Sequence, residues 1–238
     1  MQKILVYLIF LATLLFANFI DVEGAKVNDK NTKQNLPEKP ECLQLYEDMQ
    51  LEDIVNYTAF KYAYAGYNKI NVRNKDIMTL IDFSKPSTEE RFYVFDMLHK
   101  KLLFSTYVSH GKRSGENYAT SFSNKPGSHK SSPGFFVTEN AYYSGRNGYS
   151  LILNGLEKGI NDKARQRSLV IHGADYCDPS LIESGRLGRS FGCPAIPVDI
   201  NQPIIDTIKD GTLLYIYTND KNYLSTSKYI RDFRTILR

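Results

Sequence analysis

The sequence predicts a mainly β domain that is preceded by a helical segment and ends in a further helix. Three observations lead to this prediction. Through most of the chain, short apolar runs rich in β-branched and aromatic residues alternate with loops rich in Gly, Ser and Asn. Apolar residues recur at helical spacing over residues 41–71, and again over residues 222–238. We therefore expect a helical appendage at 41–71 and the main domain at 72–238.

Composition and net charge indicate a globular protein and give no sign of a nucleic-acid partner. Of the 238 residues, 42% are hydrophobic and 24% are charged, which is typical of globular proteins and excludes a disordered chain. The formal net charge of +4 comes from 30 Lys and Arg against 26 Asp and Glu. A nucleic-acid partner generally requires a more strongly basic surface than this charge indicates. We expect one large domain and no nucleic-acid partner.

The first 40 residues carry signals for export. Lys3 precedes an uncharged apolar run over residues 4–17, which is the pattern of a secretory signal peptide. We predict that the leader comprises residues 1–24 and is cleaved before Ala25; an uncleaved membrane anchor is the alternative. Residues 25–40 are polar and contain two prolines, as expected of a flexible linker. The prediction is an exported protein of the periplasm or cell envelope, with no stable membrane insertion once the leader is removed.

The strands of the main domain are predicted from its apolar runs. Two of these runs, at 91–98 and 102–108, are joined by a short polar turn and should form a hairpin. The other expected strands are 77–83, 135–138, 150–153, 169–171 and 212–217. A helix that begins at Asp199 or Asn201 should end at Gly211. The resulting outline is a predominantly antiparallel β domain.

Residues 169–199 hold the chemistry that the sequence suggests. His172 ends an apolar run, and Cys193 follows twenty-one residues later within Ser190-Phe191-Gly192-Cys193. Acyl transfer requires a thiolate that attacks and an imidazole that accepts and returns a proton. A glycine before the nucleophile lets main-chain N–H groups face a developing oxyanion. Each residue alone is more often structural than catalytic, so this prediction depends on the combination.

This pattern resembles the L,D-transpeptidases with a YkuD-like catalytic domain, and more narrowly the murein L,D-transpeptidase catalytic domain proteins. The resemblance extends over most of residues 75–217, including the segments HGKRSGENYATSFSNKPGSHKSSPGFFVTE and GLEKGINDKARQRSLVIHGADY. It implies a β-sandwich or mixed sheet. It also implies that the substrate is the tetrapeptide stem of peptidoglycan, that no cofactor is needed, and that carbapenem-type inhibitors bind.

The resemblance implies a role for each matching residue. Cys193 is the nucleophile, His172 is the general base and acid, the Gly173 carbonyl orients the imidazole, and the Gly192 and Cys193 N–H groups line the oxyanion hole. The resemblance also implies that Ser190 supports the turn. The motif departs from the family at Phe191, where a second histidine is usual, and at Ala195, where Arg or Asn is common. Substrate contacts must then come from other residues, for which Ser190, Arg186, Arg189 and Tyr176 are the candidates, although a half-buried tyrosine such as Tyr176 is more often a packing residue. The two arginines are equally compatible with a role in stabilising their loop.

Two alternatives remain open at this stage. The same Cys/His pair suits a murein amidase or endopeptidase, and an inert Cys193 would leave a non-catalytic wall-binding module. His110 also follows an apolar run, but no cysteine lies near it in the sequence. A zinc site is not expected, because the paired spacings of structural zinc ligands and the HExxH motif are missing.

The odd number of cysteines bears on the same chemistry. Three cysteines allow one disulfide and one free thiol. In an oxidising envelope Cys42 and Cys177 could form that disulfide, which would leave Cys193 free. Three reduced thiols are an equally open prediction.

Overall fold

The computed structural model describes residues 39–231. The predicted signal peptide and nearly all of the predicted linker lie outside these residues. The described part contains the following elements, in chain order: α1 (Glu41–Asp48), α2 (Tyr57–Lys69), β1 (Ile77–Asp82), β2 (Phe92–Asp96), β3 (Lys101–Thr106), β4 (Gly134–Ser144), β5 (Gly148–Gly155), β6 (Val170–Gly173), two 3₁₀ helices η1 (Asp175–Cys177) and η2 (Pro179–Ser184), β7 (Ala195–Ile196), α3 (Val198–Ile208), β8 (Leu213–Tyr217) and α4 (Lys221–Thr226).

The strands form one mixed sheet, which decides between the two predicted architectures. The sheet has eight strands in the order β3-β2-β1-β8-β4-β5-β6-β7. Pairs β1–β8 and β6–β7 are parallel, and the other pairs are antiparallel. The predicted hairpin is confirmed as β2–β3, and every predicted strand is present. The short strand β7 has no counterpart among the predictions, since two residues are too few to show a period.

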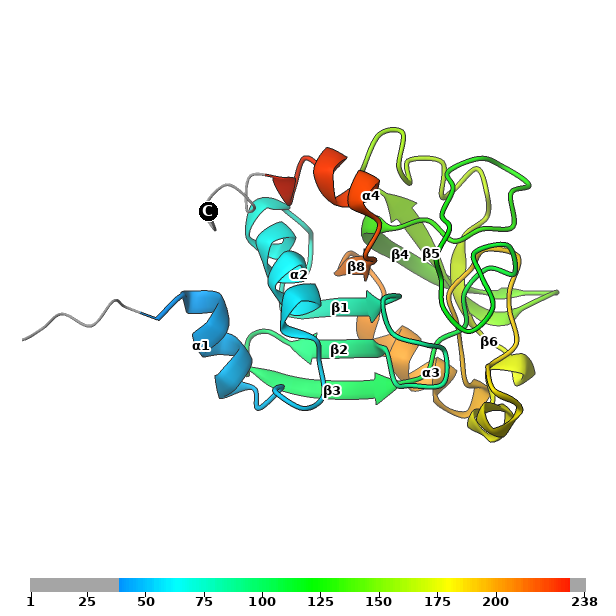
Figure 1. Ribbon diagram of the computed structural model, residues 1–238, viewed down its shortest axis with the longest axis horizontal. Coiled ribbons are helices and arrows are strands. Elements are labelled where there is room, and N and C mark those ends of the chain that lie inside the picture. The colour runs from blue at the N-terminus through cyan, green and yellow to red at the C-terminus, as the bar shows by residue number, and fades with distance from the viewer. Residues whose placement is uncertain (1–38, 232–238) are drawn as a thin grey trace, which may run out of the picture. The chain divides into compact units, whose positions relative to one another are not determined.

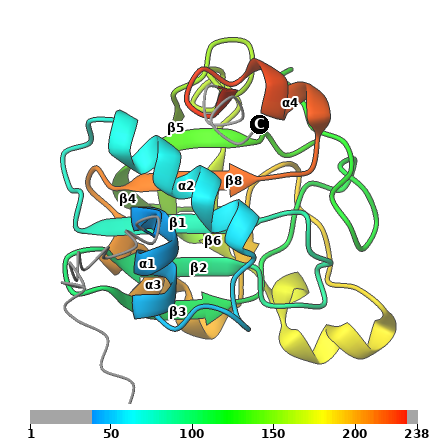
Figure 2. The ribbon, with the colours of Figure 1, turned by 60° about the vertical axis from the view of Figure 1, so that its left-hand side comes forward.

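Both faces of the central strands are buried, which explains why these strands appear in the sequence as continuous apolar runs. Successive side chains of a strand point to opposite faces. In β1, Leu80 packs in a core beneath α1 and α2, whereas Ile81 packs in a second core beneath α3. Figure 2 shows this layering, with α1 and α2 in front of the sheet and α3 behind it. The fold is therefore a three-layer arrangement.

The N-terminal helices belong to the same compact unit as the sheet. Asn56 caps α2 by accepting from the N–H groups of Thr58 and Ala59. The helix lies so close to the sheet that a Cβ on Gly66 would be 2.0 Å from the Phe135 ring. Figure 1 shows α2 lying across the strands.

Two helix boundaries differ from the predictions. Helix α3 begins after Pro197 rather than at Asp199 or Asn201. The predicted helix over 222–238 is much shorter, because α4 ends at Thr226 and Ser227 has extended backbone. The reason is tertiary: the Ser227 hydroxyl donates a hydrogen bond to the buried carboxylate of Glu157. Residues 232–238 lie outside the described part.

The predicted Cys42–Cys177 disulfide is absent, since all three cysteines are free thiols. Cys42 packs in the core beneath α1 and α2. Cys177 instead donates from its Sγ to the carbonyl of Ala195, 3.0 Å away on β7. Within residues 39–231, no helix has the length and apolar character needed to cross a membrane.

Candidate active site

Strand pairing brings His172 and the cysteine motif together. His172 lies in β6, which runs parallel to β7, and its register partner is Ala195. Cys193 precedes Ala195 by two residues, so the end of the motif lies beside the strand that carries the histidine. Neighbouring strands are about 4.8 Å apart. The two residues thus line the same cavity although twenty-one positions separate them.

The main chain of Gly173 orients the imidazole of His172. The distance from His172 Nδ1 to the Gly173 carbonyl oxygen is 2.9 Å. Because a carbonyl only accepts, Nδ1 carries the proton and Nε2 is the basic nitrogen. Burial lowers the pKa of His172, and the bond to Gly173 opposes this shift, so the ring favours its neutral form.

The Cys193 thiol is partly exposed, and its surroundings also favour the neutral form. Burial raises its pKa, while a hydrogen bond from the Val170 backbone and the charges of Arg167 and Arg146 oppose the rise. In the described part of the chain, its Sγ is hydrogen-bonded to the Ser168 carbonyl at 3.7 Å. Both partners of the proposed pair are therefore neutral at rest.

The residues from Ser190 to Cys193, here called the 190–193 loop, form a turn that is closed by their own hydrogen bonds. Ser190 Oγ accepts from the Gly192 N–H at 3.0 Å and donates to the Cys193 carbonyl at 2.6 Å. Gly192 has φ +129°, where a side chain would be strained, and a Cβ there would lie 3.0 Å from the Lys130 carbonyl. The glycine is thus required by the turn.

These bonds bear on the roles that the family resemblance implies for Gly192 and Ser190. The Gly192 N–H is already paired with Ser190 Oγ, so it is not available to an oxyanion in this conformation. Ser190 is buried and its hydroxyl holds the turn, and the residue also lines the cavity. Local side-chain to main-chain bonds of this kind are typical of serine in turns.

A second segment supports the 190–193 loop from behind. The Ser190 N–H donates to the His110 carbonyl at 2.9 Å. Ser131 Oγ bridges the two segments: it accepts from the Gly111 N–H at 3.0 Å and donates to the Gly192 carbonyl at 3.2 Å. His110 itself is fully buried, so it does not line the cavity.

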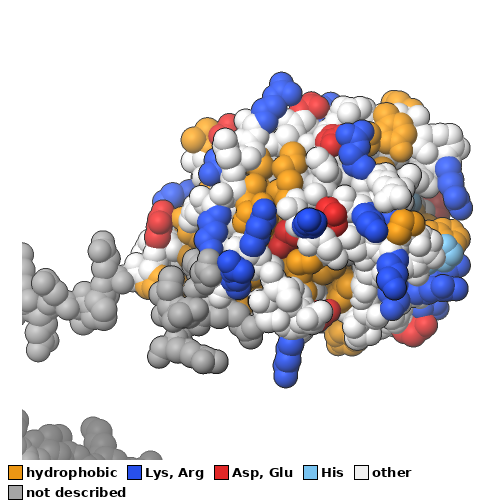
Figure 3. Space-filling model, turned by 90° about the horizontal axis from the view of Figure 1, so that it is seen from above, with side chains coloured by type: hydrophobic (Ala, Val, Ile, Leu, Met, Phe, Trp, Pro, Cys, Tyr) orange, Lys and Arg blue, Asp and Glu red, His pale blue; other side chains and the backbone are white. Residues whose placement is uncertain are grey.

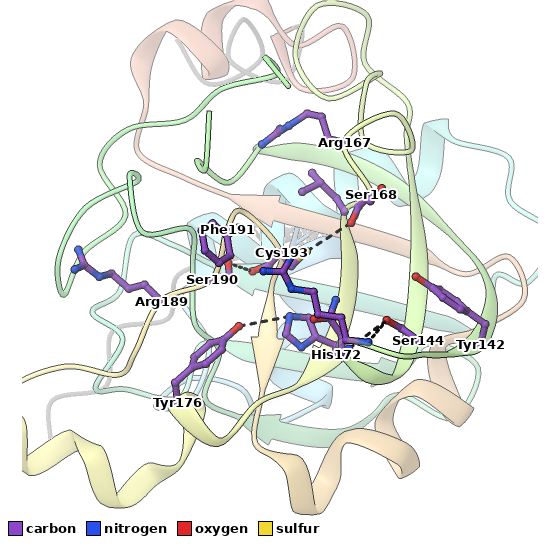
Figure 4. A pocket seen from close by; sticks show the side chains of 13 residues that line it. Tyr142, Ser144, Arg167, Ser168, His172, Tyr176, Arg189, Ser190, Phe191 and Cys193 are labelled. Carbon is purple, nitrogen blue, oxygen red and sulfur yellow. Dashed lines mark hydrogen bonds between the residues drawn. The ribbon is translucent and has the colours of Figure 1, made fainter. Parts of the chain in front are cut away.

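The cavity has a volume of about 550 Å³, and the β4–β5 hairpin forms one of its walls. A bulge in β4 between Thr138 and Ala141 changes the register of this hairpin. Its far end contributes Tyr142, Ser144, Arg146 and Asn147, and the other lining residues are Arg167, Ser168, Leu169, His172, Tyr176, Arg189, Ser190, Phe191 and Cys193. Figure 4 shows His172 and Cys193 at the centre of this group.

Tyr176 lines the cavity and also contacts the histidine. Its hydroxyl lies 3.5 Å from His172 Nε2, the nitrogen that lacks a proton. Burial raises the pKa of this phenol, so the hydroxyl keeps its proton and is the donor of this long hydrogen bond. Figure 4 shows the hydroxyl pointing at the imidazole.

The two arginines predicted to bind substrate are engaged elsewhere. Arg189 donates to Glu116 and to the carbonyl of Gly115, and Figure 4 shows its guanidinium pointing away from the centre of the cavity. Arg186 forms an ion pair with the same Glu116 at 3.1 Å and does not line the cavity. Their interactions support the alternative reading, in which the pair stabilises its loop.

Sequence reasoning missed two other arginines, Arg146 and Arg167, which do line the cavity. Arg167 is held by its neighbours, since it donates to the carbonyls of Ser123 and Lys130. Arg146 lies near the tip of the β4–β5 hairpin. No local motif marks either residue, because the sheet brings them to the site from distant positions. Within residues 39–231, no group of three or more His, Cys, Asp and Glu side chains is arranged to hold a metal ion.

Comparison with known proteins identifies the family. The family model described as L,D-transpeptidase catalytic domain matches residues 51–217, which is more than half of the chain. No curated protein matches. Among solved structures, an L,D-transpeptidase from Mycobacterium smegmatis is 13% identical with a TM-score of 0.37, and the match covers 60% of this chain and 59% of that one.

Two further solved structures have a similar sequence identity and TM-score to this chain. An L,D-transpeptidase from Stackebrandtia nassauensis is 13% identical with a TM-score of 0.38, and the match covers 76% of this chain and 77% of that one. A fused Zn-dependent amidase/peptidase/peptidoglycan-binding domain protein from Clostridium acetobutylicum is 18% identical with a TM-score of 0.38, at 68% and 62% coverage. On the match of the family model over residues 51–217, the chain belongs to the L,D-transpeptidase catalytic domain family.

Proposed function

We propose that this protein is a peptidoglycan-modifying acyltransferase that joins stem peptides through a thioester on Cys193. The observation that carries the proposal is the shared cavity of Cys193 and His172. There, the bond from Nδ1 to the Gly173 carbonyl leaves Nε2 as a proton acceptor. Family membership supports the class of reaction, and the tetrapeptide stem is the substrate that this class implies.

In the first half-reaction, Sγ attacks the carbonyl carbon of the third, diamino acid residue of the stem. The thiol proton passes to His172 Nε2 as the S–C bond forms. The C–N bond to the terminal D-alanine then breaks, and its nitrogen takes the proton from the imidazolium. The products are a Cys193 thioester and free D-alanine, and the histidine is neutral again.

In the second half-reaction, an amine of another stem attacks the thioester carbonyl. The amine proton passes to His172, the new C–N bond forms, and the S–C bond breaks. The imidazolium then returns its proton to the Cys193 thiolate. Water in place of the amine would give an L,D-carboxypeptidase by the same steps. No cofactor enters either half-reaction.

The oxyanion donor in this scheme is the main-chain N–H of Cys193. The Gly192 N–H is paired with Ser190 Oγ, whereas within residues 39–231 the Cys193 N–H donates to no main-chain carbonyl. A single oriented donor is worth roughly a hundredfold or more in rate.

The proposal is tested by mass spectrometry of the purified protein. Incubation with a carbapenem should add the mass of the inhibitor, and incubation with a disaccharide-tetrapeptide should yield D-alanine and a joined dimer. Cys193→Ala should lose the adduct and the products, by at least a thousandfold in rate, because the nucleophile is gone. Cys42→Ala, which removes a thiol far from the cavity, should retain both.

The products separate the alternatives. Release of D-alanine without dimer would indicate the carboxypeptidase, and cleavage of a different bond would indicate an amidase or endopeptidase. A carbapenem adduct that persists in Cys193→Ala would contradict the assignment of the nucleophile. Failure to form any adduct or product would indicate a non-catalytic wall-binding module.

We also propose that the protein is exported to the periplasm or cell envelope. The apolar run over residues 4–17 supports this, as does a substrate that lies outside the cytoplasmic membrane. N-terminal sequencing of the protein from a cell-envelope fraction should begin at Ala25. A protein that remains in the cytoplasm with Met1 intact would contradict export.

A further inference from the structure

An exposed aromatic ring at the mouth of the cavity is surrounded by basic side chains. Phe191 is 53% exposed, although it lies within the 190–193 loop. Lys112 Nζ lies 4.2 Å from the centre of its ring and Arg146 Cζ lies 5.4 Å from it. The His129 ring meets Phe191 edge-on at 4.8 Å. We call Lys112, His129, Arg146 and Phe191 the Phe191 platform.

The side chains of Lys112 and Arg146 differ from the other arginines at this site, which are either ion-paired or held by main-chain carbonyls. Arg186 and Arg189 are both paired with Glu116, and Arg167 is held by the Ser123 and Lys130 carbonyls. Over residues 39–231, neither Lys112 nor Arg146 lies within ion-pair distance of a carboxylate. Their charges are therefore available to a ligand.

The field of these cations reaches both the rim and the thiol. At the rim, the pKa of His129 is lowered first by burial and then by the charges of Lys112 and Arg113. In the cavity, Arg146 is among the groups that oppose the burial-driven rise of the Cys193 pKa. Figure 3 shows Lys and Arg side chains and a histidine gathered at the right-hand edge of the molecule. A positive rim of this kind attracts anionic substrates.

The platform also spans two elements that lie far apart in the sequence. Lys112 belongs to the segment that supports the 190–193 loop, whereas Arg146 lies at the tip of the β4–β5 hairpin. Both approach the same ring, and Arg146 and Phe191 line the cavity that contains Cys193. Ala195 is fully buried, so no polar side chain at that motif position faces the substrate.

We propose that Arg146 and Lys112, held over the ring of Phe191, bind a free carboxylate of the peptide substrate. This inference rests on the proposed function, because it names the group of the stem peptide that the site selects. Arg146 offers a forked donor to the carboxylate, and Lys112 adds a point charge at the rim. The carboxylate belongs either to the terminal D-alanine or, in stems whose diamino acid is a dicarboxylic acid, to the side chain of that residue.

The test measures binding without chemistry, in the full chain carrying Cys193→Ala. The ligands are three soluble tetrapeptides: the free acid, one amidated at the terminal carboxylate, and one amidated at the diamino acid carboxylate. We expect one amidated form to bind about tenfold more weakly than the free acid, since a charged hydrogen bond is worth about that factor. The form that loses affinity identifies the carboxylate.

Substitution of the cations should remove this discrimination. Arg146→Gln, and to a lesser extent Lys112→Gln, should weaken binding of the free acid towards that of the amide, with little further effect on the amide itself. Arg165→Gln is the matched control, because it removes an exposed guanidinium that is paired with Glu139. The control should bind as the parent does, and circular dichroism should show that every variant is folded.

Three results would overturn the proposal: equal affinity for the free acid and both amides, an equal loss in Arg165→Gln, or no binding of any peptide. The experiment is separate from the test of the reaction. Selective binding of the free acid, without turnover by the protein that retains Cys193, would uphold the carboxylate subsite and contradict the acyltransferase.

Discussion

At the scale of single residues, burial has the same effect on the two groups of the proposed catalytic pair. It lowers the pKa of His172 and raises that of Cys193, so both changes favour a neutral imidazole and a neutral thiol. A pair of this kind transfers its proton during attack rather than before it. Nε2, the nitrogen that would accept, faces the Tyr176 hydroxyl at 3.5 Å.

The pH dependence of acylation follows from the His172 shift. Only the neutral imidazole accepts a proton, and its pKa lies below the ordinary value of 6.5. Protonation of His172 therefore inactivates the site only below that pH. As the pH is raised, kcat/KM should increase with a midpoint below pH 6.5. The rate of carbapenem adduct formation measured from pH 4 to 8 checks this. A midpoint above 6.5 would instead indicate that the Cys193 thiol must lose its proton before it attacks.

At the scale of elements, the 190–193 loop is held by segments that the sequence separates widely. The segment after β3 pairs with it through main-chain bonds, and Ser131 joins both by its hydroxyl. Beneath them lies the fully buried Arg91, which donates to the Val108 carbonyl and contacts His110 Nδ1 at 2.9 Å. Burial lowers the pKa of His110 to about 3, so this ring stays neutral and accepts from the arginine.

Removal of the Ser131 hydroxyl should make the 190–193 loop less rigid without changing the residues that line the cavity. Ser131→Ala leaves the Gly111 N–H and the Gly192 carbonyl without their bridge, at a cost of about 1–3 kcal/mol in the free energy of unfolding. Because the loop positions the nucleophile, we expect carbapenem acylation to slow about tenfold or more. Urea unfolding and stopped-flow acylation measure the two effects.

Ser225→Ala is the control for this prediction, because it removes an exposed hydroxyl that bonds within α4. It should change neither quantity by more than the error of measurement. If Ser131→Ala lowers stability but acylates at the parent rate, Ser131 is structural and does not position Cys193.

At the scale of the whole molecule, the sheet is stabilised by a separate core on each face. Helices α1 and α2 cover one face and α3 covers the other, so a change in either layer acts on the same strands. Glu157 ties the C-terminal region to this assembly: its carboxylate accepts from the Phe135 N–H and from the Ser227 hydroxyl. Helices α1 and α2 therefore contribute to the stability of the domain that contains the sheet.

The close approach of α2 to the sheet gives a test of this view. In Gly66→Ala the new Cβ would lie 2.0 Å from the Phe135 ring, so the helix must move away from β4. We expect a loss of about 1–3 kcal/mol in the free energy of unfolding, as is usual for overpacked cores. Thermal or urea unfolding of the whole chain should show one transition at lower stability.

Gly145→Ala is the matched control, because a Cβ at that position of the hairpin turn meets nothing within 4 Å. Its stability should stay close to that of the parent chain. If Gly66→Ala were equally harmless, or if the helices unfolded in a separate transition, residues 41–71 would be an independent appendage.

Sequence patterns predicted the strands well because both faces of the sheet are buried. The run at 77–83 is apolar throughout, as a strand covered on both sides should be. The helix predicted at 222–238 is present, but its extent over residues 227–231 was wrong for a reason that no local pattern contains. Its apolar residues recur at helical spacing, but the buried carboxylate of Glu157, seventy residues away in the chain, takes the hydroxyl of Ser227 and ends α4 early.

By itself, the sequence determined what depends on residue type and near neighbours. It indicated the strands, the His172 and Cys193 pair, and the need for glycine at position 192. Only the tertiary structure decided which charges are free, because ion pairing depends on what distant segments bring together. Arg186 and Arg189 are occupied by Glu116, whereas the hairpin tip brings Arg146 to Phe191. The candidate substrate contacts therefore moved from the motif to the rim of the cavity.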